Sequence, residues 1–206
     1  MTTSPDHSTR SLRTTPGARI GLLGGSFNPA HEGHLHISRV ALNRLRLDQV
    51  WWLVSLQNPL KNATDLASLK QRLERAKVTA HDPRIVVSNL EVELGTRYTI
   101  DTVSALQRRF PNLKFVWLMG GDNFVQLPQW KNWRQLMRRI AVAVIARPGF
   151  TMRARVARAA RTFAAAKVNE SAAARLMDHP PPAWVLLEGR LHRASATAIR
   201  RLGLWP

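Results

Sequence analysis

The stretch Arg19-Ile-Gly-Leu-Leu-Gly-Gly25 is a short apolar run that closes on a pair of glycines, and it decides the fold. An apolar run of about four to eight residues that is bounded by a turn signal is typical of a buried strand. Residues 33–47 follow with apolar side chains at helical spacing, and residues 50–55 (VWWLVS) form a second apolar run. Strand, helix and strand in this order predict a βαβ unit with parallel strands.

The same alternation continues along the rest of the chain. We expect further strands at residues 84–88, 114–119, 140–146 and 184–187, and further helices at residues 66–80, 99–110, 130–139, 151–178 and 196–202. Uniformly apolar strands separated by helices indicate a parallel sheet with both faces covered. The predicted fold class is α/β, a doubly wound Rossmann-like parallel sheet with helices on both faces. Ligands of such sheets bind at the carboxyl ends of the strands, where the glycine and polar clusters of this chain fall.

Composition limits the classes of protein that need to be considered. The chain has 206 residues, of which 45% are hydrophobic, so we expect a single globular domain at residues 19–206. Residues 1–18, rich in Ser, Thr and Pro, are expected to form a disordered basic tail. The absence of cysteine excludes disulfides, thiolate metal sites and a cysteine nucleophile. No apolar run approaches the roughly 18 residues of a membrane span, and the N-terminus lacks a signal-like apolar core, so a cytoplasmic location is expected.

The charge of the chain points to an anionic partner. Lys and Arg number 31 against 13 Asp and Glu, a formal net charge of +18. Nucleic acid, a phospholipid surface and phosphorylated small molecules all fit this charge. The chain lacks helix-turn-helix, zinc-finger and RNP signatures, so we expect neither specific nucleic-acid binding nor a membrane partner. A basic nucleic-acid-binding protein stays as the alternative from a different class, and no particular oligomeric state is predicted.

Residues 24–36 (GGSFNPAHEGHLH) form the first polar motif, directly after the first expected strand. Glycine at positions 24 and 25 allows the backbone to approach a phosphate closely. His31 and His34 lie three residues apart at the start of a helix, where free N–H groups and a partial positive charge favour anions. The pair therefore suits a polyphosphate, although simple helix capping would also account for it. A zinc site would need a third ligand nearby.

Residues 194–200 (ASATAIR) form the second motif, at the start of the last expected helix. Ser195 and Thr197 are residue types that cap helices, and capping alone would explain them. Together with free N–H groups and Arg200 one turn further on, the hydroxyls also form a cradle for an anion.

The two motifs together resemble those of the nucleotidyltransferase superfamily. Its signature is a glycine pair, a Phe-Asp/Asn-Pro turn and His-x-Gly-His, with Ile-Ser-Ser-Thr-x-Ile-Arg near the C-terminus. Here Ala194 and Ala196 replace the first Ile and the second Ser, so one hydroxyl is missing. The resemblance implies that His31, His34 and Arg200 are catalytic. The ATP-binding residues that it implies are Gly24, Gly25, Ser26, Phe27, His31, His34, Gly120, Asp122, Ser195, Thr197 and Arg200.

Four further segments resemble the bacterial nicotinate-nucleotide adenylyltransferases of this superfamily: residues 58–61 (NPLK), 98–102 (YTIDT), 120–133 (GGDNFVQLPQWKNW) and 147–149 (RPG). The resemblance implies transfer of the adenylyl group of ATP to nicotinate mononucleotide in NAD biosynthesis, without a covalent enzyme intermediate. It also implies Mg²⁺ on the ATP phosphates, with no metal ligand from a protein side chain. The mononucleotide-binding residues that it implies are Asn28, Lys61, Tyr98, Thr99, Trp130 and Arg147.

Most of these residues have chemistry that fits a pyridine mononucleotide. An indole such as Trp130 can stack on a flat ring, Asp122 can accept hydrogen bonds from ribose, and Thr99 with neighbouring N–H groups can bind a carboxylate. Arg147 and Lys61 are candidates for the phosphate. Each of three residues also has a purely structural alternative. Trp130 could be a core residue, Asp122 could form an Asx turn, and Thr99 could cap the helix.

Related enzymes offer less suitable alternatives. Phosphopantetheine adenylyltransferases share the first motif but usually place Thr where His31 stands. Cytidylyltransferases keep the histidines but favour an Arg-Thr-x-Gly-Ile-Ser run that this chain lacks. The closest alternative is the same reaction with a preference for nicotinamide mononucleotide.

Overall fold

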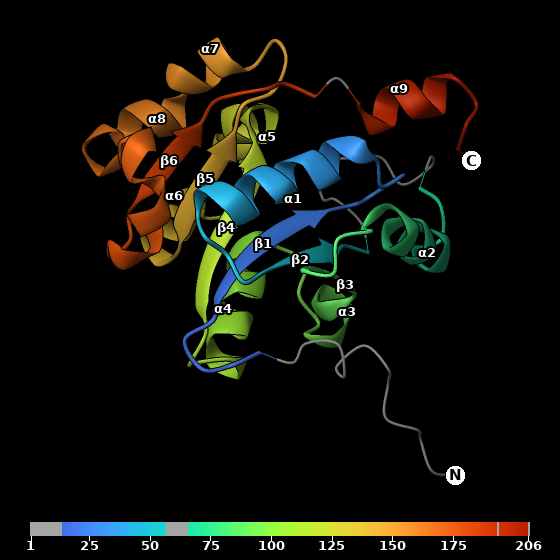
Figure 1. Ribbon diagram of the computed structural model, residues 1–206, viewed down its shortest axis with the longest axis horizontal. Helices are drawn as coiled ribbons and strands as arrows, with labels where there is room; N and C mark the ends of the chain where they lie inside the picture. Colours follow the sequence, from blue (N-terminus) through green and yellow to red (C-terminus); the bar gives the residue numbers. More distant parts are fainter. Residues whose placement is uncertain (1–13, 57–65, 193, 206) are drawn as a thin grey trace.

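The structure, a computed structural model, describes residues 14–56, 66–192 and 194–205. Within these residues, six strands form one parallel sheet in the order β3-β2-β1-β4-β5-β6 (Figure 1). The strands are β1 (Arg19–Gly25), β2 (Gln49–Val54), β3 (Ile85–Ser88), β4 (Lys114–Gly120), β5 (Ala141–Ile145) and β6 (Trp184–Leu187). The chain therefore adds β2 and β3 on one side of β1 and then β4, β5 and β6 on its other side. This is the doubly wound order. The predicted fold class is confirmed, and the topological switch point lies between β1 and β4.

Each strand is apolar at consecutive positions because both of its faces are buried. In β2, Trp51 and Leu53 belong to one core cluster, whereas Val50, Trp52 and Val54 belong to the cluster on the opposite face. This division follows the two-residue period of side chains along a strand. The buried tryptophans fill space on both faces of the sheet.

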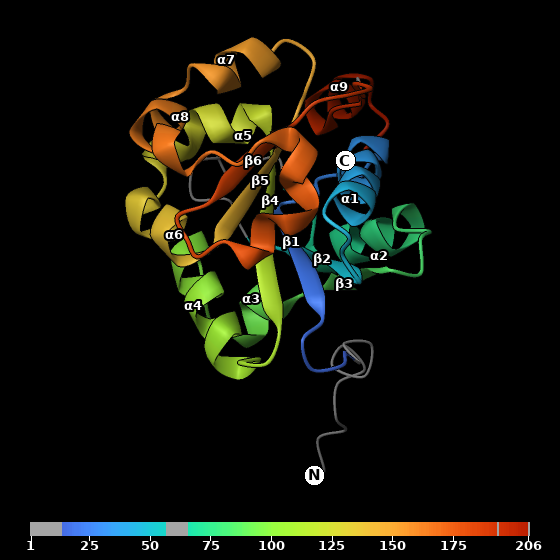
Figure 2. The same ribbon diagram turned by 60° about the vertical axis from the view of Figure 1, so that its left-hand side comes forward.

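Helices cover both faces, as Figure 2 shows in a view nearly along the sheet. One face carries α1 (Glu32–Arg44), α2 (Leu69–Thr79) and the 3₁₀ segment η5 (Glu170–Asp178). The other face carries α3 (Leu90–Glu93), α4 (Thr99–Arg109), α5 (Gly121–Gln126), η3 (Leu127–Gln129), α6 (Trp133–Arg139), α7 (Thr151–Arg155) and α8 (Arg158–Thr162). The last helix, α9 (Ala196–Arg201), lies beside the N-terminal end of α1 (Figures 1 and 2).

One expected helix is wrong, because residues 151–178 do not form a single helix. They form α7, α8, a short 3₁₀ turn η4 (Ala164–Ala166) and η5. The carbonyl of Phe163 accepts a hydrogen bond from Trp184 Nε1 at 2.8 Å, and Lys167 pairs with Trp184 in an isolated parallel bridge. Since α8 packs into one core cluster and η5 into the other, the segment passes around the sheet edge at β6. One straight helix could not cover both faces.

The short helices α3 and α5 were not expected from the sequence, and residues 120–122 lead into α5 rather than into a loop. At the other end of the domain, the amide of Gly17 donates a hydrogen bond to the carbonyl of Asn112 at 2.7 Å, and Ala18 is buried. The last residues of the expected tail, 14–18, thus contact the domain, while residues 1–13 lie outside the described part. Among the described residues, no helix is long and apolar enough to span a membrane.

Candidate active site

A cleft of about 280 Å³ lies at the carboxyl ends of β1 and β4, where the doubly wound fold predicts ligand binding. Residues from the loop after β1, the starts of α4 and α5, the turn after β5 and the start of α9 line it. The predicted site residues among them are Gly24, Gly25, Ser26, Phe27, Asn28, His31, His34, Tyr98, Thr99, Gly120, Asp122, Trp130, Arg147, Ser195 and Thr197. Arg200 is not part of the lining, and Lys61 lies outside the described residues.

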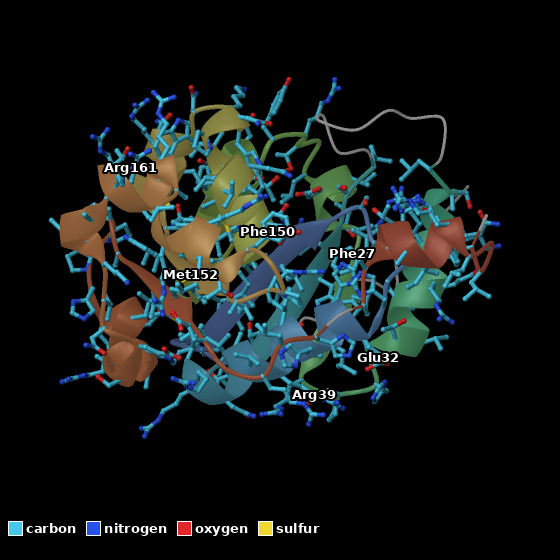
Figure 3. All side chains as sticks on the ribbon, turned by 90° about the horizontal axis from the view of Figure 1, so that it is seen from above. Phe27, Glu32, Arg39, Phe150, Met152 and Arg161 are labelled. Carbon is cyan, nitrogen blue, oxygen red and sulfur yellow. The ribbon has the colours of Figure 1, made fainter. Side chains whose placement is uncertain are left out.

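The loop after β1 is held by aromatic packing. Phe27 has φ of 46°, in the left-handed region that is costly for a bulky side chain. Its ring stacks on Trp52, with centroids 5.0 Å apart, and contacts the ring of His34 at 4.6 Å. Figure 3 shows Phe27 in the space between α1 and α9, with Glu32 and Arg39 at the outer side of α1. The buried ring thus holds the unusual backbone and supports one of the two histidines.

The two histidines form a capping box at the start of α1. His31 Nδ1 accepts a hydrogen bond from the Gly33 amide at 3.0 Å, and His34 Nδ1 accepts one from the His31 amide at 3.2 Å. A neutral imidazole that accepts at Nδ1 carries its hydrogen on Nε2. The capping interpretation is therefore correct, and it is compatible with phosphate binding because the cap selects the tautomer with an Nε2–H donor.

Protonation of His31 is strongly disfavoured. Burial lowers the pKa of His31 to about 4, and the charges of Arg147 and His192 act in the same direction. Because this pKa lies well below neutrality, the His31 imidazole is neutral under ordinary conditions. It therefore offers an anion a fixed N–H dipole rather than a full positive charge.

Glycine is required between the two histidines. A Cβ at Gly33 would lie 2.8 Å from Cε1 and 2.9 Å from Nδ1 of His31, and 3.0 Å from the carbonyl oxygen of Ala194. Only a residue without a side chain lets the His31 ring and the segment before α9 approach the first turn of α1 this closely.

The start of α5, directly after β4, places an acid beside an arginine. Asp122 lies in the first turn of α5, and its buried Oδ1 has no hydrogen-bond partner among the described residues. Arg147 Nε lies 3.9 Å from that oxygen, while Arg147 Nη2 donates to the carbonyl of Ala194 at 3.1 Å. A Cβ on Gly120 would lie 2.6 Å from Cδ of Arg147, so glycine makes room for the arginine. Asp122 Oδ1 can accept a hydrogen bond from a ligand.

The second motif closes the cleft and ties it to the first. Ser195 caps α9, its Oγ accepting a hydrogen bond from the Ala198 amide at 3.1 Å. Arg200 Nη1 donates to the carbonyl of Asn28, and Trp205 Nε1 donates to Asn28 Oδ1 at 2.7 Å. The structure thus places the predicted catalytic Arg200 at the border of the cleft, where it holds the loop after β1.

The opposite side of the cleft is built around the start of α4. Tyr98 precedes the helix, and Lys131 Nζ lies 4.5 Å above its ring while pairing with Asp101 at 3.0 Å. Trp130 meets Trp117 edge to face, with centroids 6.4 Å apart. Sequence reasoning missed several lining residues, namely Ser55, Glu91, Arg97, Trp117, Asn123, Gln129 and Lys131. Of these, Asn123, Gln129 and Lys131 stand inside the segment at residues 120–133, whereas Glu91 belongs to the unexpected helix α3.

Arg72 of α2 is a second buried residue that sequence reasoning missed. Its guanidinium donates to the carbonyls of Ser26 at 2.7 Å, Ser55 at 2.6 Å, Leu56 at 3.0 Å and Ala67 at 2.9 Å. The side chain is almost fully buried. Arg72 therefore fixes the ends of β1 and β2 from below the cleft. Among the described residues, no group of three or more His, Asp and Glu side chains could hold a metal ion.

Comparison with known proteins agrees with this architecture. Residues 22–202 match the family model described as cytidylyltransferase-like, which defines the class as that of the nucleotidyltransferases. The fold is similar to a structure of Plasmodium falciparum nicotinic acid mononucleotide adenylyltransferase complexed with NaAD. The TM-score is 0.67 at 18% identity, over 89% of this chain and 83% of that one.

Closer relatives narrow the class. A protein of Parvibaculum lavamentivorans named probable nicotinate-nucleotide adenylyltransferase is 52% identical over 191 residues, which is 93% of this chain and 95% of its own. A relative of the same name from Caulobacter sp. (strain K31) is 50% identical over 88% of this chain and 96% of its own. Another, from Cereibacter sphaeroides, is 49% identical over 90% of this chain and 98% of its own. The chain belongs to the nicotinate-nucleotide adenylyltransferase family.

Gly33→Ala tests the packing between the two histidines. We expect the added methyl group to displace the His31 ring and to lower turnover with ATP at least about tenfold, because small misplacements in a site are costly. Gly121→Ala is the matched control, since its Cβ would meet only ordinary contacts of 3.5 Å or more. Equal turnover of the two variants in a pyrophosphate-release assay would contradict this account.

Arg72→Ala tests the support beneath the cleft. We expect it to lower the free energy of unfolding by about 3 kcal/mol, because four buried carbonyls lose a charged donor. Arg75→Ala, at an exposed position of the same helix, should change it by less than about 0.5 kcal/mol. Urea unfolding measures both values, and similar losses in the two variants would argue against the supporting role of Arg72.

Proposed function

We propose that this chain transfers the adenylyl group of ATP to nicotinate mononucleotide, giving nicotinate adenine dinucleotide and pyrophosphate in NAD biosynthesis. The observation that carries the proposal is that the two histidines, the start of α9 and the start of α4 line one cleft. Membership of the nicotinate-nucleotide adenylyltransferase family supports the same reaction and the same acceptor.

ATP occupies the side of the cleft between the loop after β1 and the start of α9. The Nε2–H groups of His31 and His34 donate to the phosphates, because their Nδ1 atoms are occupied by the cap. Ser195 and Thr197 line this side, and Arg200 keeps the loop in place through Asn28. Asp122 Oδ1, which has no hydrogen-bond partner among the described residues, accepts a hydrogen bond from a ribose hydroxyl.

The mononucleotide occupies the side of the cleft toward α4. Trp130 stacks on the pyridine ring, and Thr99 with the free N–H groups of the first turn of α4 binds the carboxylate. Arg147 binds the 5′-phosphate from the turn after β5. Tyr98, which precedes α4, completes this side. Asn28, in the loop after β1, is a further candidate for the mononucleotide, and Lys61, outside the described residues, is a further candidate for its phosphate.

The transfer itself needs positioning more than covalent chemistry. An oxygen of the mononucleotide 5′-phosphate attacks the α-phosphorus of ATP in line, the bond to the β-phosphate oxygen breaks, and pyrophosphate leaves. The protein brings two anions together and directs N–H donors at the oxygens where charge develops. Because the cap holds the imidazoles in place, these donors need no reorganisation during the reaction.

Mg²⁺ belongs to this proposal as an ion carried by the ATP phosphates. The charged side chains that line the cleft are the cations Arg97, Lys131 and Arg147 and the acids Asp122 and Glu91. This lining suits the binding of anions better than the direct coordination of a metal ion by side chains. When bound, the ion neutralises charge on the phosphate oxygens. We place the reaction in the cytoplasm, where ATP is supplied by metabolism.

Pyrophosphate release with ATP and Mg²⁺ tests the proposal directly. Nicotinate mononucleotide, nicotinamide mononucleotide and phosphopantetheine are compared as acceptors, and we expect release with the first to exceed that with the others. A preference for nicotinamide mononucleotide would move the substrate but keep the mechanism. Silence of the folded protein with all three would reject the proposed function and favour a nucleic-acid partner, checked by salt-dependent DNA binding.

His34→Ala tests the proposed phosphate donors. We expect turnover to fall more than about tenfold, because the variant loses an N–H donor to the phosphates. His36→Ala serves as the control, since His36 is on the same helix but does not line the cleft. Thermal unfolding of both variants checks that the fold is intact, and normal turnover by folded His34→Ala would refute the role.

A further inference from the structure

Glu91 is a buried acid in the cleft that the proposed mechanism does not use. It is the second residue of α3 and is 7% exposed, yet it lines the same cleft as Tyr98 and Thr99. A carboxyl group in this position is unusual, because buried acids normally have a cationic partner.

A small network of hydroxyl groups joins Glu91 to the first turn of α4. Thr102 Oγ1 donates to Glu91 Oε1 at 3.4 Å, and Thr96 Oγ1 lies 2.9 Å from Thr102 Oγ1. The Thr96 amide donates to the carbonyl of Glu91 at 2.9 Å, and Thr102 also lies against the carbonyl of Tyr98. The carboxyl group of Glu91 is thus fixed close to the helix end at which we place the carboxylate of the substrate.

Two of the three cations near this network pair with other acids. Arg109 pairs with Glu93 of α3 at 3.8 Å, and Lys131 pairs with Asp101 of α4 at 3.0 Å. Arg97 lines the cleft, with its guanidinium carbon 6.0 Å from the centre of the Tyr98 ring. No ion pair of Glu91 is present among the described residues.

Burial without a cation sets the protonation of this group. Burial raises the pKa of Glu91 to about 7, and the hydrogen bond from Thr102 acts in the opposite direction. Glu91 is therefore neutral below this pH and becomes ionised above it. An added negative charge nearby would raise the pKa further, because two carboxylates in one poorly hydrated site do not both ionise.

We propose that Glu91 selects between the acid and amide forms of the mononucleotide, its protonated form admitting the nicotinate carboxylate at the start of α4 and its ionised form opposing it. This inference rests on the proposed function. When Glu91 is ionised, binding of nicotinate mononucleotide takes up one proton from solution, which stays on the Glu91 carboxyl group. Nicotinamide mononucleotide has a neutral amide and requires no such proton.

Glu91 is accordingly a residue of substrate selection and takes no part in adenylyl transfer. Its protonation should change kcat/KM for the acid substrate through KM, while kcat at saturation stays nearly constant. A purely structural role would instead affect both substrates in the same way.

The test is the ratio of kcat/KM for nicotinate mononucleotide to that for nicotinamide mononucleotide, measured from about pH 6 to about pH 8.5. The two substrates share the 5′-phosphate and ATP, so titration of the phosphate and of the histidines cancels in the ratio. In the wild-type protein the ratio should fall by up to about tenfold for each pH unit above the pKa of Glu91. In Glu91→Gln the ratio should be nearly independent of pH and higher than in the wild type at alkaline pH.

Two variants sharpen the result. Glu93→Gln, in the same short helix, should keep the wild-type profile, because Glu93 pairs with Arg109 and does not line the cleft. Thr102→Val removes the hydrogen bond that lowers the pKa of Glu91, so the fall of the ratio should move to higher pH. A wild-type ratio that does not change with pH, or the same fall in Glu91→Gln, would overturn the inference.

Calorimetry on the wild-type protein provides a measurement that needs no variant. Binding of nicotinate mononucleotide at mildly alkaline pH, in two buffers of different ionisation enthalpy, should show more proton uptake than binding of nicotinamide mononucleotide. Equal proton uptake with the two ligands would also reject the role of Glu91. Absence of turnover with either mononucleotide would reject the proposed function and this inference together, whereas turnover with a pH-independent ratio rejects the inference alone.

Discussion

At the start of α1, backbone N–H groups have no carbonyl of the preceding helical turn to bond to. The imidazoles of His31 and His34 accept hydrogen bonds from two of these N–H groups. The Nδ1 atoms accept from the Gly33 and His31 amides. These two hydrogen bonds fix the tautomer and the position of each imidazole ring. The position of the His31 ring in turn requires glycine at position 33. A helix cap, ordinarily an element of stability, thus becomes the device that directs two N–H donors into the cleft.

The cap also connects the two halves of the fold. His34 packs on Phe27, which stacks on Trp52 of β2, whereas the carbonyl of Ala194, from the segment before α9, lies over Gly33. Arg147, after β5, donates to that same carbonyl, and Arg200 donates to the carbonyl of Asn28. The strands on either side of the switch point therefore share one cleft. Residues about 170 positions apart in the chain meet there because the parallel sheet places all carboxyl ends at one edge.

Local patterns predicted the sheet well, because strands such as 50–55 and 184–187 are buried on both faces and consist of apolar residues throughout. The error at residues 151–178 has a clear origin. Alanine and arginine favour a helix locally, but contacts of Phe163 and Lys167 with Trp184 break it at the sheet edge. Motifs located most of the cleft lining. They could not locate Arg72 or Glu91, because an arginine in an amphipathic helix and a glutamate in a four-residue helix carry no local sign of burial.

The large positive charge of the chain and the chemistry of the cleft act at different ranges. A net charge of +18 attracts phosphorylated ligands from a distance, but salt screens that attraction and it does not distinguish one anion from another. Within the cleft, burial lowers the pKa of His31 to about 4, so its neutral imidazole offers phosphate oxygens a fixed N–H dipole rather than a positive charge. Its donor is unchanged across the neutral range. Glu91, with a pKa near 7, changes its charge in that same range. The cleft therefore combines the His31 donor, which stays neutral in this range, with a pH-dependent group near the start of α4, so the proposed selection of the acceptor can vary with pH while this donor stays the same.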